Sequence, residues 1–288
     1  MTAREHGGSD VRWDFSSCAN AAGPCPMALA ALRAADPARH ADPDSCSVRE
    51  ALAALHGVAP TRVLIACSAS EFIQRFTAIS GRLWPGAVRV PRHAYGDYAA
   101  AALAWGREPV HDDEEAAVTL RWFADPSSPL GQDEAPPPHP GACPGVLDAV
   151  YAPLRLSGHT AWTQEASDAV FVLHSPNKAL GLPGLRGAYA IAPRTTNDDL
   201  TACLHALAAA APSWPLSAQA DAVLRCWARP DTQAWLRQSR ATLAAWKTEL
   251  QTQLAARGFV CRASVTPHFV VQPPRPLSPA ALRAHGVA

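Results

Sequence analysis

Residues 168–192 read DAVFVLHSPNKALGLPGLRGAYAIA and place Lys178 between two apolar, strand-like runs. Lysine is scarce in this chain, since only Lys178 and Lys247 among the 25 Lys+Arg residues are lysine. A chain with this bias keeps lysine where an amine is needed, because an amine can lose its proton and condense with an aldehyde. Lys247 lies in an amphipathic helical stretch, LAAWKTELQTQL, and is expected to be an ordinary solvated residue. Lys178 is therefore the candidate catalytic residue.

Strand-like and helix-like patterns alternate around this stretch. Strands are expected at residues 62–66, 87–90, 119–124, 145–150, 169–174 and 187–192, with a short one near residue 108. Helices are expected at 26–35, 48–56, 70–80 and 95–105 and at several places between 198 and 257, followed by strands at 259–264 and 268–272 and a final helix. The alternation predicts an α/β fold with a mainly parallel sheet covered on both faces. Ligands of such sheets bind beyond the carboxyl ends of the strands, which predicts a crevice around Asp125, Asp148 and Ser175.

The bulk composition argues against several classes of partner. The 288 residues are 48% hydrophobic and carry a formal net charge of zero, so neither nucleic acid nor an anionic membrane surface is an expected partner. No apolar run approaches the roughly 20 residues that span a bilayer, and MTAREHGGSD has no apolar signal segment. We therefore expect a cytoplasmic protein. Its eight cysteines are scattered without a C-x-x-C pair, so reduced thiols and no metal site are expected.

Two short motifs at strand ends carry a recognisable chemistry. Asp148 and Tyr151 form D-x-x-Y at the end of one predicted strand, and Ser175 and Lys178 form S-x-x-K at the end of the next. Such a set fits pyridoxal phosphate: the lysine amine condenses with the cofactor aldehyde, and the carboxylate keeps the pyridine nitrogen protonated. The tyrosine hydroxyl then bonds the phenolic oxygen of the ring.

The phosphate of such a cofactor needs hydrogen-bond donors. Ser175 and Arg186 supply a hydroxyl and a guanidinium, and Ala69 and Ser70 open a helix directly after a strand, so their backbone N–H groups are available. Tyr95, in the turn RHAYGDY, is placed to stack on the ring face. Each feature alone has a plain structural alternative, such as a helix cap, a surface cation or a core tyrosine. The ordered combination favours the cofactor.

Beyond these single residues, longer segments resemble a known family. SPNKALGLPGLRGAYAIA resembles the lysine-to-arginine segment of class I/II aminotransferases, VLDAVY resembles their D-E-A-Y strand, and ADPSSPLG resembles their N-P-x-N-P-T-G loop. The segments WDFSSCANAAGPCP, HADPDSCSVREALAALHGV, VLIACSASEFI and HAYGDYAAA are similar to the histidinol-phosphate aminotransferase branch and to its relative, L-threonine-O-3-phosphate decarboxylase of cobalamin synthesis. The resemblance runs from about residue 13 to the end.

The resemblance implies the fold type I architecture of pyridoxal-phosphate enzymes. Residues 1–25 would form an N-terminal arm, 26–210 a three-layer αβα large domain with a mainly parallel mixed sheet, and 211–288 a small, truncated α+β domain. It further implies a homodimer. By position, Lys178 would be the Schiff-base lysine, with the cofactor held by Ala69, Ser70, Tyr95, Ser128, Asp148, Tyr151, Ser175 and Arg186.

Several positions depart from the family pattern. Ser128 stands where an asparagine bonds the phenolic oxygen, Ser68 where a glycine approaches the phosphate, and His40 where a tyrosine reaches across the dimer. In the N-terminal motif Cys18 replaces one asparagine, whereas Asn20 and Gly23 remain and are expected to contact substrate.

The C-terminal segment departs further. Gln272 occupies the place of a carboxylate-binding arginine in TPHFVVQPP, and we expect the segment that carries a second arginine motif to be missing. Arg262 and Arg275 lie nearby in the sequence without a predicted place in the pocket. The cofactor machinery thus looks intact and the substrate machinery eroded.

Three functions follow from these observations. The first is an aminotransferase that acts on an amino acid or amino phosphate, with threonine-phosphate decarboxylase as its close alternative. The second is a degenerate member of the fold that binds cofactor or partner without turnover. The third, a Rossmann-type nucleotide binder, is disfavoured because ACSASE stands where G-x-G-x-x-G is needed.

Overall fold

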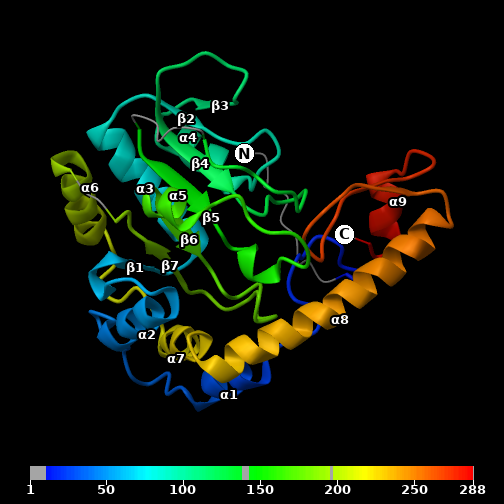
Figure 1. Cartoon of the computed structure of the whole chain (residues 1–288), viewed down its shortest axis with the longest axis horizontal. Helices are drawn as coiled ribbons and strands as arrows, with labels where there is room; N and C mark the ends of the chain where they lie inside the picture. Colours follow the sequence, from blue (N-terminus) through cyan, green and yellow to red (C-terminus); the bar gives the residue numbers. More distant parts are fainter. Residues whose placement is uncertain (1–10, 138–142, 195–196, 288) are drawn as a thin grey trace.

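The computed structural model describes residues 11–137, 143–194 and 197–287, and its largest feature is a seven-stranded sheet (Figure 1). Its strands are β1 (Val63–Ala66), β2 (Ala87–Arg89), β3 (Pro109–Val110), β4 (Val118–Ala124), β5 (Gly145–Asp148), β6 (Phe171–His174) and β7 (Ala188–Ile191). The spatial order is β1-β7-β6-β5-β4-β2-β3. β7 runs antiparallel to both of its neighbours, and the other pairs are parallel. The predicted α/β fold with a mainly parallel mixed sheet is confirmed.

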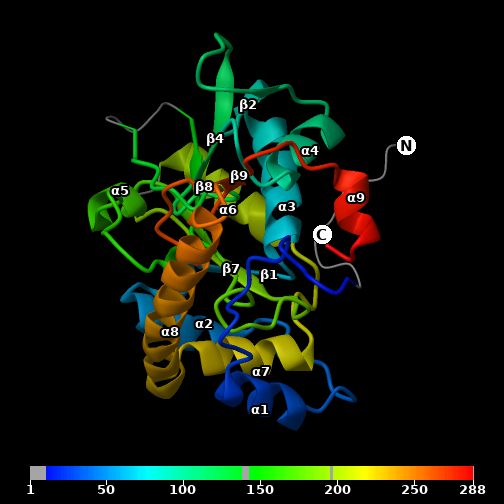
Figure 2. The same ribbon diagram turned by 90° about the vertical axis from the view of Figure 1, so that its right-hand side faces the viewer.

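Helices cover both faces of the sheet, as Figures 1 and 2 show. One face carries α3 (Ala69–Leu83), α4 (Asp97–Ala104) and α6 (Asp198–Ala209), and the other carries α1 (Pro26–Ala34), α2 (Cys46–His56) and α7 (Ala218–Trp227). β7 serves both layers because side chains alternate along a strand. Tyr189 and Ile191 pack with α2 and α7, whereas Ala188 and Ala190 pack with α3 and α6. Both faces of the central strands are therefore buried.

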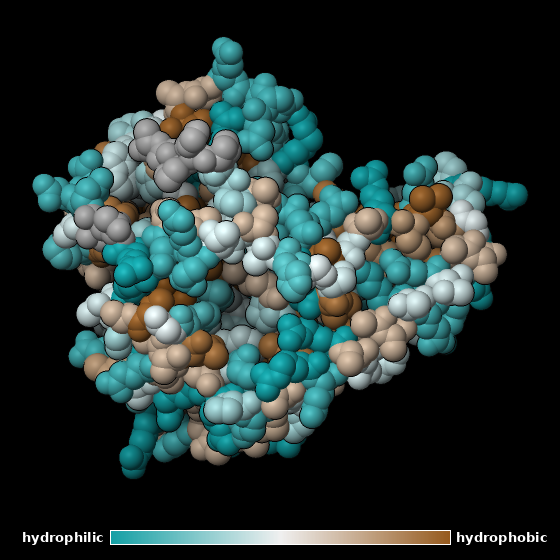
Figure 3. Space-filling view, in the orientation of Figure 1, coloured by the Kyte–Doolittle hydropathy of each residue, from teal (hydrophilic) through white to brown (hydrophobic). Residues whose placement is uncertain are grey.

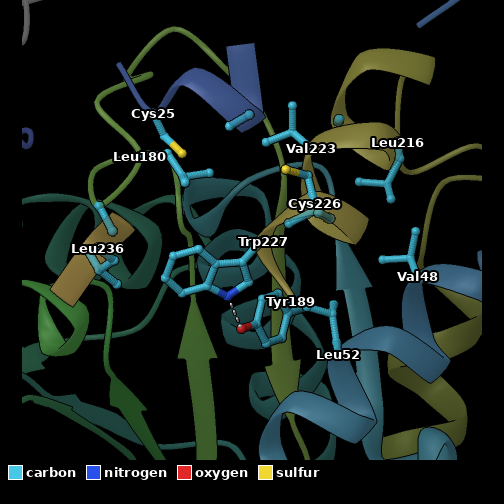
Figure 4. Close-up of a cluster of buried hydrophobic side chains, with 14 of the residues drawn as sticks. Cys25, Val48, Leu52, Leu180, Tyr189, Leu216, Val223, Cys226, Trp227 and Leu236 are labelled. Atoms are coloured by element: carbon cyan, nitrogen blue, oxygen red, sulfur yellow. Dashed lines mark hydrogen bonds between the residues drawn. The ribbon is translucent and has the colours of Figure 1, made fainter. Parts of the chain in front are cut away.

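A tryptophan–tyrosine pair lies in the core beneath the sheet (Figure 4). Trp227, at the end of α7, donates its indole N–H to the hydroxyl of Tyr189 at 3.1 Å, and both side chains are buried. Apolar residues from α1, α2 and α7 surround the pair, among them Val48, Leu52 and Val223. α7, which follows the predicted domain boundary at residue 210, packs against α1 and α2 of the large domain. The boundary itself stays a prediction.

The C-terminal segment leaves the sheet on one long helix. α8 (Pro230–Ala255) has 26 residues and so is about 39 Å long, and it leads to the two-stranded antiparallel pair β8 (Val260–Cys261) and β9 (Val271–Gln272), then to α9 (Pro279–Ala284) (Figure 1). The N-terminal segment returns to this end, where Trp13 bridges Val287 and donates its N–H to Gly286 O at 2.8 Å. The two ends of the described chain thus meet beside α9.

The observed elements differ from the expected ones in a few places. The strand expected at 145–150 ends at Asp148, because the chain turns there into the short 3₁₀ helix η2 (Ala152–Leu154). A second 3₁₀ helix, η1 (Pro60–Arg62), and the short helix α5 (Gln164–Asp168) were not expected. On the face in Figure 3 hydrophilic residues predominate, with hydrophobic ones in small groups. No described helix is both long and apolar enough to cross a membrane.

Candidate active site

A cavity of about 700 Å³ opens where β4, β5 and β6 end. Its lining includes Lys178 and every residue expected to hold the cofactor, namely Ala69, Ser70, Tyr95, Ser128, Asp148, Tyr151, Ser175 and Arg186. These side chains come from five segments that are apart in the sequence and that meet at one edge of the sheet. Ligands of open α/β sheets bind at this edge.

Asp148 forms the buried end of the cavity. Its Oδ2 accepts a hydrogen bond from the hydroxyl of Tyr98 at 2.5 Å, and its Oδ1 accepts one from the backbone N–H of Val150 at 2.9 Å. Burial raises the pKa of Asp148, and the two donors oppose that shift. No cationic side chain among the described residues forms an ion pair with it. A buried carboxylate in this position suits a ligand that brings its own positive charge, such as a protonated ring nitrogen.

Tyr98 was missed by the sequence analysis, which selected Tyr95 from the same motif. Tyr98 is 1% exposed, stacks on Trp122 with ring centroids 4.8 Å apart, and burial raises its pKa well above the usual value. Tyr95 lies nearer the cavity mouth, where its hydroxyl is 3.1 Å from Ser70 Oγ. Tyr98 lies in the first turn of α4 and Tyr95 lies just before the helix, with the two ring centroids 6.0 Å apart. The only signal in the sequence was the second tyrosine of the motif RHAYGDY.

Asn177 shapes the loop that carries the lysine. Its Oδ1 accepts the backbone N–H of Lys178 at 2.8 Å, and its Nδ2 donates to Pro183 O and Leu185 O, each at 3.3 Å. Ser175 Oγ lies 3.1 Å from the same Oδ1. The amide of Asn177 therefore folds residues 177–186 so that Lys178 and Arg186 line one cavity, a role that the sequence analysis did not assign.

The start of α3 supplies an anion-binding end to the cavity. Ala69 and Ser70 line it, and helix N-termini attract anions through their unpaired N–H groups. Ser68, which stands where the family has a glycine, caps this helix with its side chain, which accepts the N–H of Glu71 at 3.1 Å, and it does not line the cavity. Arg186, exposed at the rim, forms no ion pair with the described residues.

Tyr151 lies on the opposite wall. Ser128 and Cys18 lie near its hydroxyl and affect its charge, and burial raises the pKa of Tyr151 above the usual value. Burial also raises the pKa of the Cys18 thiol, although the nearby Lys178 opposes the shift. Cys18 and its neighbours Asp14, Ser16 and Ser17 line the outer part of the cavity, so the N-terminal segment closes one side of it.

Asn20 and Gly23 lie elsewhere, although they were expected at the substrate. Asn20 Nδ2 donates to Ala179 O and to Ser239 Oγ, each at 2.9 Å, and neither Asn20 nor Gly23 lines the cavity. A Cβ on Gly23 would lie 3.0 Å from Gly181 Cα. Both residues lie away from the cavity because the N-terminal segment is hydrogen-bonded to the loop that carries Lys178. For example, the N–H of Asn20 donates to Lys178 O at 2.8 Å. They support the loop rather than face a ligand.

Asp125 also departs from its expected place in the crevice. Its Oδ2 accepts from Arg155 Nη2 at 2.8 Å and from Thr160 Oγ1 at 2.5 Å, and it lines a separate cavity of about 760 Å³. The ion pair with Arg155 turns the carboxylate away from Asp148.

Among the departures from the family pattern, Ser128 and Cys18 line the 700 Å³ cavity, whereas Gln272 and His40 lie outside it. Gln272 is exposed on β9, Arg262 and Arg275 are exposed nearby, and His40 stacks on Trp214 with centroids 4.7 Å apart. Among the described lining residues, Lys178 and Arg186 are therefore the cations.

Comparison with known proteins agrees with this geometry. The family model of aminotransferase class I and II matches residues 142–287, just over half of the chain. The chain belongs to the class I and II aminotransferase family. Among its relatives, the histidinol-phosphate aminotransferase of Ruegeria pomeroyi is 29% identical over 270 residues, covering 85% of this chain and 72% of that protein.

Solved structures share the fold of this aminotransferase-family chain. The histidinol-phosphate aminotransferase of Sinorhizobium meliloti, in complex with pyridoxal-5'-phosphate, has a TM-score of 0.71 at 19% identity over 87% of this chain and 72% of that one. L-threonine-O-3-phosphate decarboxylase of Porphyromonas gingivalis has a TM-score of 0.71 at 17% identity over 90% and 81%. The predicted family, fold type and aminotransferase-like enzyme class are confirmed.

Proposed function

We propose that this aminotransferase-family chain binds pyridoxal phosphate in the 700 Å³ cavity through Lys178 and transfers the amino group of an amino acid or amino phosphate. The observation that carries the proposal is the presence of Lys178 and the buried, cation-free Asp148 in one cavity. A structural lysine would gain nothing from this arrangement. A cofactor with an aldehyde and a basic ring nitrogen uses both groups.

The donor set fits the cofactor at each of its polar groups. Asp148 would hold the proton on the ring nitrogen, while Tyr98 and Val150 fix the carboxylate. Tyr151 would donate to the phenolic oxygen, with Ser128 beside it. The phosphate would be held by the residues that line the anion-binding end, namely Ala69, Ser70, Ser175 and Arg186. Tyr95 would cover the ring face.

When bound, the cofactor supplies an electron sink for the bond that breaks at the substrate α-carbon. The chain supplies the proton transfers. With the cofactor bound, the Lys178 amine would be the base that takes up and moves the proton leaving the substrate α-carbon. Cys18 and the rest of the N-terminal segment close the outer side of the cavity and limit access of water.

The relatives favour transamination over decarboxylation. The R. pomeroyi relative is named a histidinol-phosphate aminotransferase and is similar in sequence, whereas the threonine-phosphate decarboxylase is similar in fold. We therefore take histidinol phosphate, with a 2-oxo acid as acceptor, as the first substrate pair to test.

The direct test measures amino-group transfer by the purified protein loaded with pyridoxal phosphate. We expect product from the wild type and none from Lys178→Ala or Lys178→Arg, because neither side chain can condense with the aldehyde. Arg237→Ala, which removes an exposed cation on α8, should retain the wild-type rate. Release of CO₂ from threonine phosphate instead would favour the decarboxylase. A folded, cofactor-binding wild type that converts neither substrate would favour the degenerate, non-catalytic member of the fold.

Three finer expectations stay predictions. A homodimer would give twice the chain mass in sedimentation equilibrium, and a cytoplasmic location would show in fractionation of the source cells. A role in cobalamin synthesis depends on the decarboxylase outcome above.

A further inference from the structure

A turn of the C-terminal segment, residues 264–268, packs against the wall of the proposed active site. We propose that Lys247 is a positioning residue that fixes this turn and thereby holds the His268 ring against Tyr151. Any effect of Lys247 on the cofactor rests on the proposed function, because it would act through Tyr151, the residue expected to bond the phenolic oxygen of the cofactor. The contacts of the turn themselves do not depend on a cofactor.

Lys247 is not the ordinary solvated residue that the sequence led us to expect. From α8 its Nζ donates to Ser264 O at 2.5 Å and to Thr266 O at 2.7 Å, and it lies 5.9 Å from the centre of the Phe269 ring. Burial lowers its pKa. One ammonium thus donates to two carbonyl groups of the turn, which an apolar side chain cannot do.

The turn is closed internally around the carbonyl of His268. Ser264 Oγ donates to His268 O at 2.6 Å, and Thr266 Oγ1 donates to the same oxygen at 3.0 Å. Thr266 is fully buried. Because Lys247 holds the carbonyls of the same two residues, its ammonium and the two hydroxyls together set where His268 lies.

The closed turn docks on the two loops that carry Ser128 and Tyr151. The N–H of Val265 donates to Gly131 O at 2.7 Å, and the N–H of Leu156 donates to Val265 O at 2.7 Å. Gly131 has a φ of +66°, and a Cβ at that position would collide with the hydroxyls of Ser264 and Thr266. The backbone of the turn therefore approaches the Gly131 loop more closely than any residue with a side chain would allow.

The buried ring nitrogens of His268 form no hydrogen bonds with the described part of the chain that would stabilise the position of the ring. Its ring meets Tyr151 edge-on, with centroids 4.7 Å apart at 62°, and neither ring nitrogen has a hydrogen-bond partner among the described residues, although the Ser127 backbone lies close enough to affect its charge. Burial lowers its pKa to about 4, so the ring is neutral at neutral pH. Buried nitrogens without partners cost free energy. The ring must therefore be held in place by the turn, and its contact is with the Tyr151 side chain.

The first experiment needs no cofactor. In Lys247→Met, which keeps an unbranched side chain one atom shorter and removes the ammonium, we expect the amides of Val265 and Leu156 to exchange hydrogen at least about tenfold faster than in the wild type. The His268 ring signals in NMR should then titrate near the ordinary histidine pKa. Arg237→Met, on the same helix, is the matched control and should change neither. Lys247→Arg should restore part of the protection, since a guanidinium can also donate to two carbonyls. Unchanged exchange and titration in Lys247→Met would overturn the proposal.

In the second experiment pyridoxal phosphate is added and the visible absorbance band is titrated with pH. The measured quantity is the midpoint, the pH at which the band is half-changed. A hydroxyl donor stabilises the ionised phenolic oxygen, so loss of a well-placed Tyr151 should raise the midpoint by about half a pH unit or more. Lys247→Met and His268→Ala should both raise it, without an additive effect in the double variant, whereas His268→Phe keeps an aromatic edge and should not. If Lys247→Met leaves the midpoint unchanged, Lys247 has only a structural role, and the proposal that it positions Tyr151 through His268 is overturned. A wild type with no band would instead count against cofactor binding, and the cofactor-free experiment would still decide whether Lys247 holds the turn.

Discussion

The hydroxyl of Tyr98 donates to Oδ2 of Asp148 at 2.5 Å, which joins the start of α4 to the end of β5. Both side chains are buried, and Tyr98 is further held by its stacking on Trp122. A neutral donor of this kind favours the ionised carboxylate without cancelling its charge. Asp148 is thus prepared to pair with a cation that enters the cavity.

Tyr98→Phe should weaken cofactor binding. Loss of a hydrogen bond to a charged group costs about 1.5–3 kcal/mol, so the dissociation constant for pyridoxal phosphate should rise about tenfold or more. Titration of the absorbance band measures it. Tyr95→Phe, which keeps the ring at the cavity mouth, should have a smaller effect. Equal affinities for Tyr98→Phe and the wild type would show that the Tyr98 hydroxyl does not support Asp148.

Gly181 should be intolerant of a side chain, unlike its neighbour Gly184. Gly181 has a φ of +66°, and a Cβ there would lie 2.9 Å from Gly23 Cα, whereas a Cβ on Gly184 would meet nothing within 4 Å. Gly181→Ala should lower the free energy of unfolding by about 2 kcal/mol or more, and Gly184→Ala by less than about 0.5 kcal/mol. Urea denaturation compares the two. Similar stabilities would mean that the N-terminal segment does not pack on the lysine loop as described.

Acid should destabilise the fold through His56. Burial lowers the pKa of His56 to about 4, and its Nε2 lies 2.8 Å from the hydroxyl of Tyr189. The unfolded chain, with a histidine pKa of about 6.5, takes up the proton first as the pH falls. The stability contribution of the neutral ring is therefore complete above about pH 6.5 and is lost progressively towards about pH 4.

The measurement compares the free energy of unfolding at about pH 7.5 and about pH 5.5. His56→Gln should reduce the difference by about 1 kcal/mol. His205→Gln, which removes an exposed histidine on α6, should leave it as in the wild type. The same pH dependence in all three proteins would contradict a neutral, buried His56.

Local patterns in the sequence were sufficient to predict the sheet and much of the candidate site. Asp148 and Ser175 follow apolar runs that become adjacent parallel strands, so their meeting at one edge is a consequence of strand order. Lys178 could be selected because lysine is otherwise almost absent. These inferences depend on residues within a few positions of a strand end. The place of such a residue in space follows directly from its distance along the chain from that strand end.

The features that were missed depend on long-range contacts. The role of Lys247 requires a turn 17–19 residues further along to fold back onto α8. Asn20 was expected at the substrate, but its amide is used by Ala179 and Ser239, which are distant in sequence. Tyr98 required knowledge of which face of α4 lies over β5. None of these contacts leaves a periodic pattern in the sequence.

The most direct test of the central claim is reduction with borohydride after incubation with pyridoxal phosphate, followed by peptide mapping. Reduction makes the bond between a lysine amine and the cofactor permanent, and the two lysines of the chain lie in different peptides. We predict that the added mass is found on the peptide with Lys178 and is lost in Lys178→Ala. Label on Lys247 alone, or equal label in the Lys178→Ala variant, would contradict the assignment of the cavity as a pyridoxal-phosphate site.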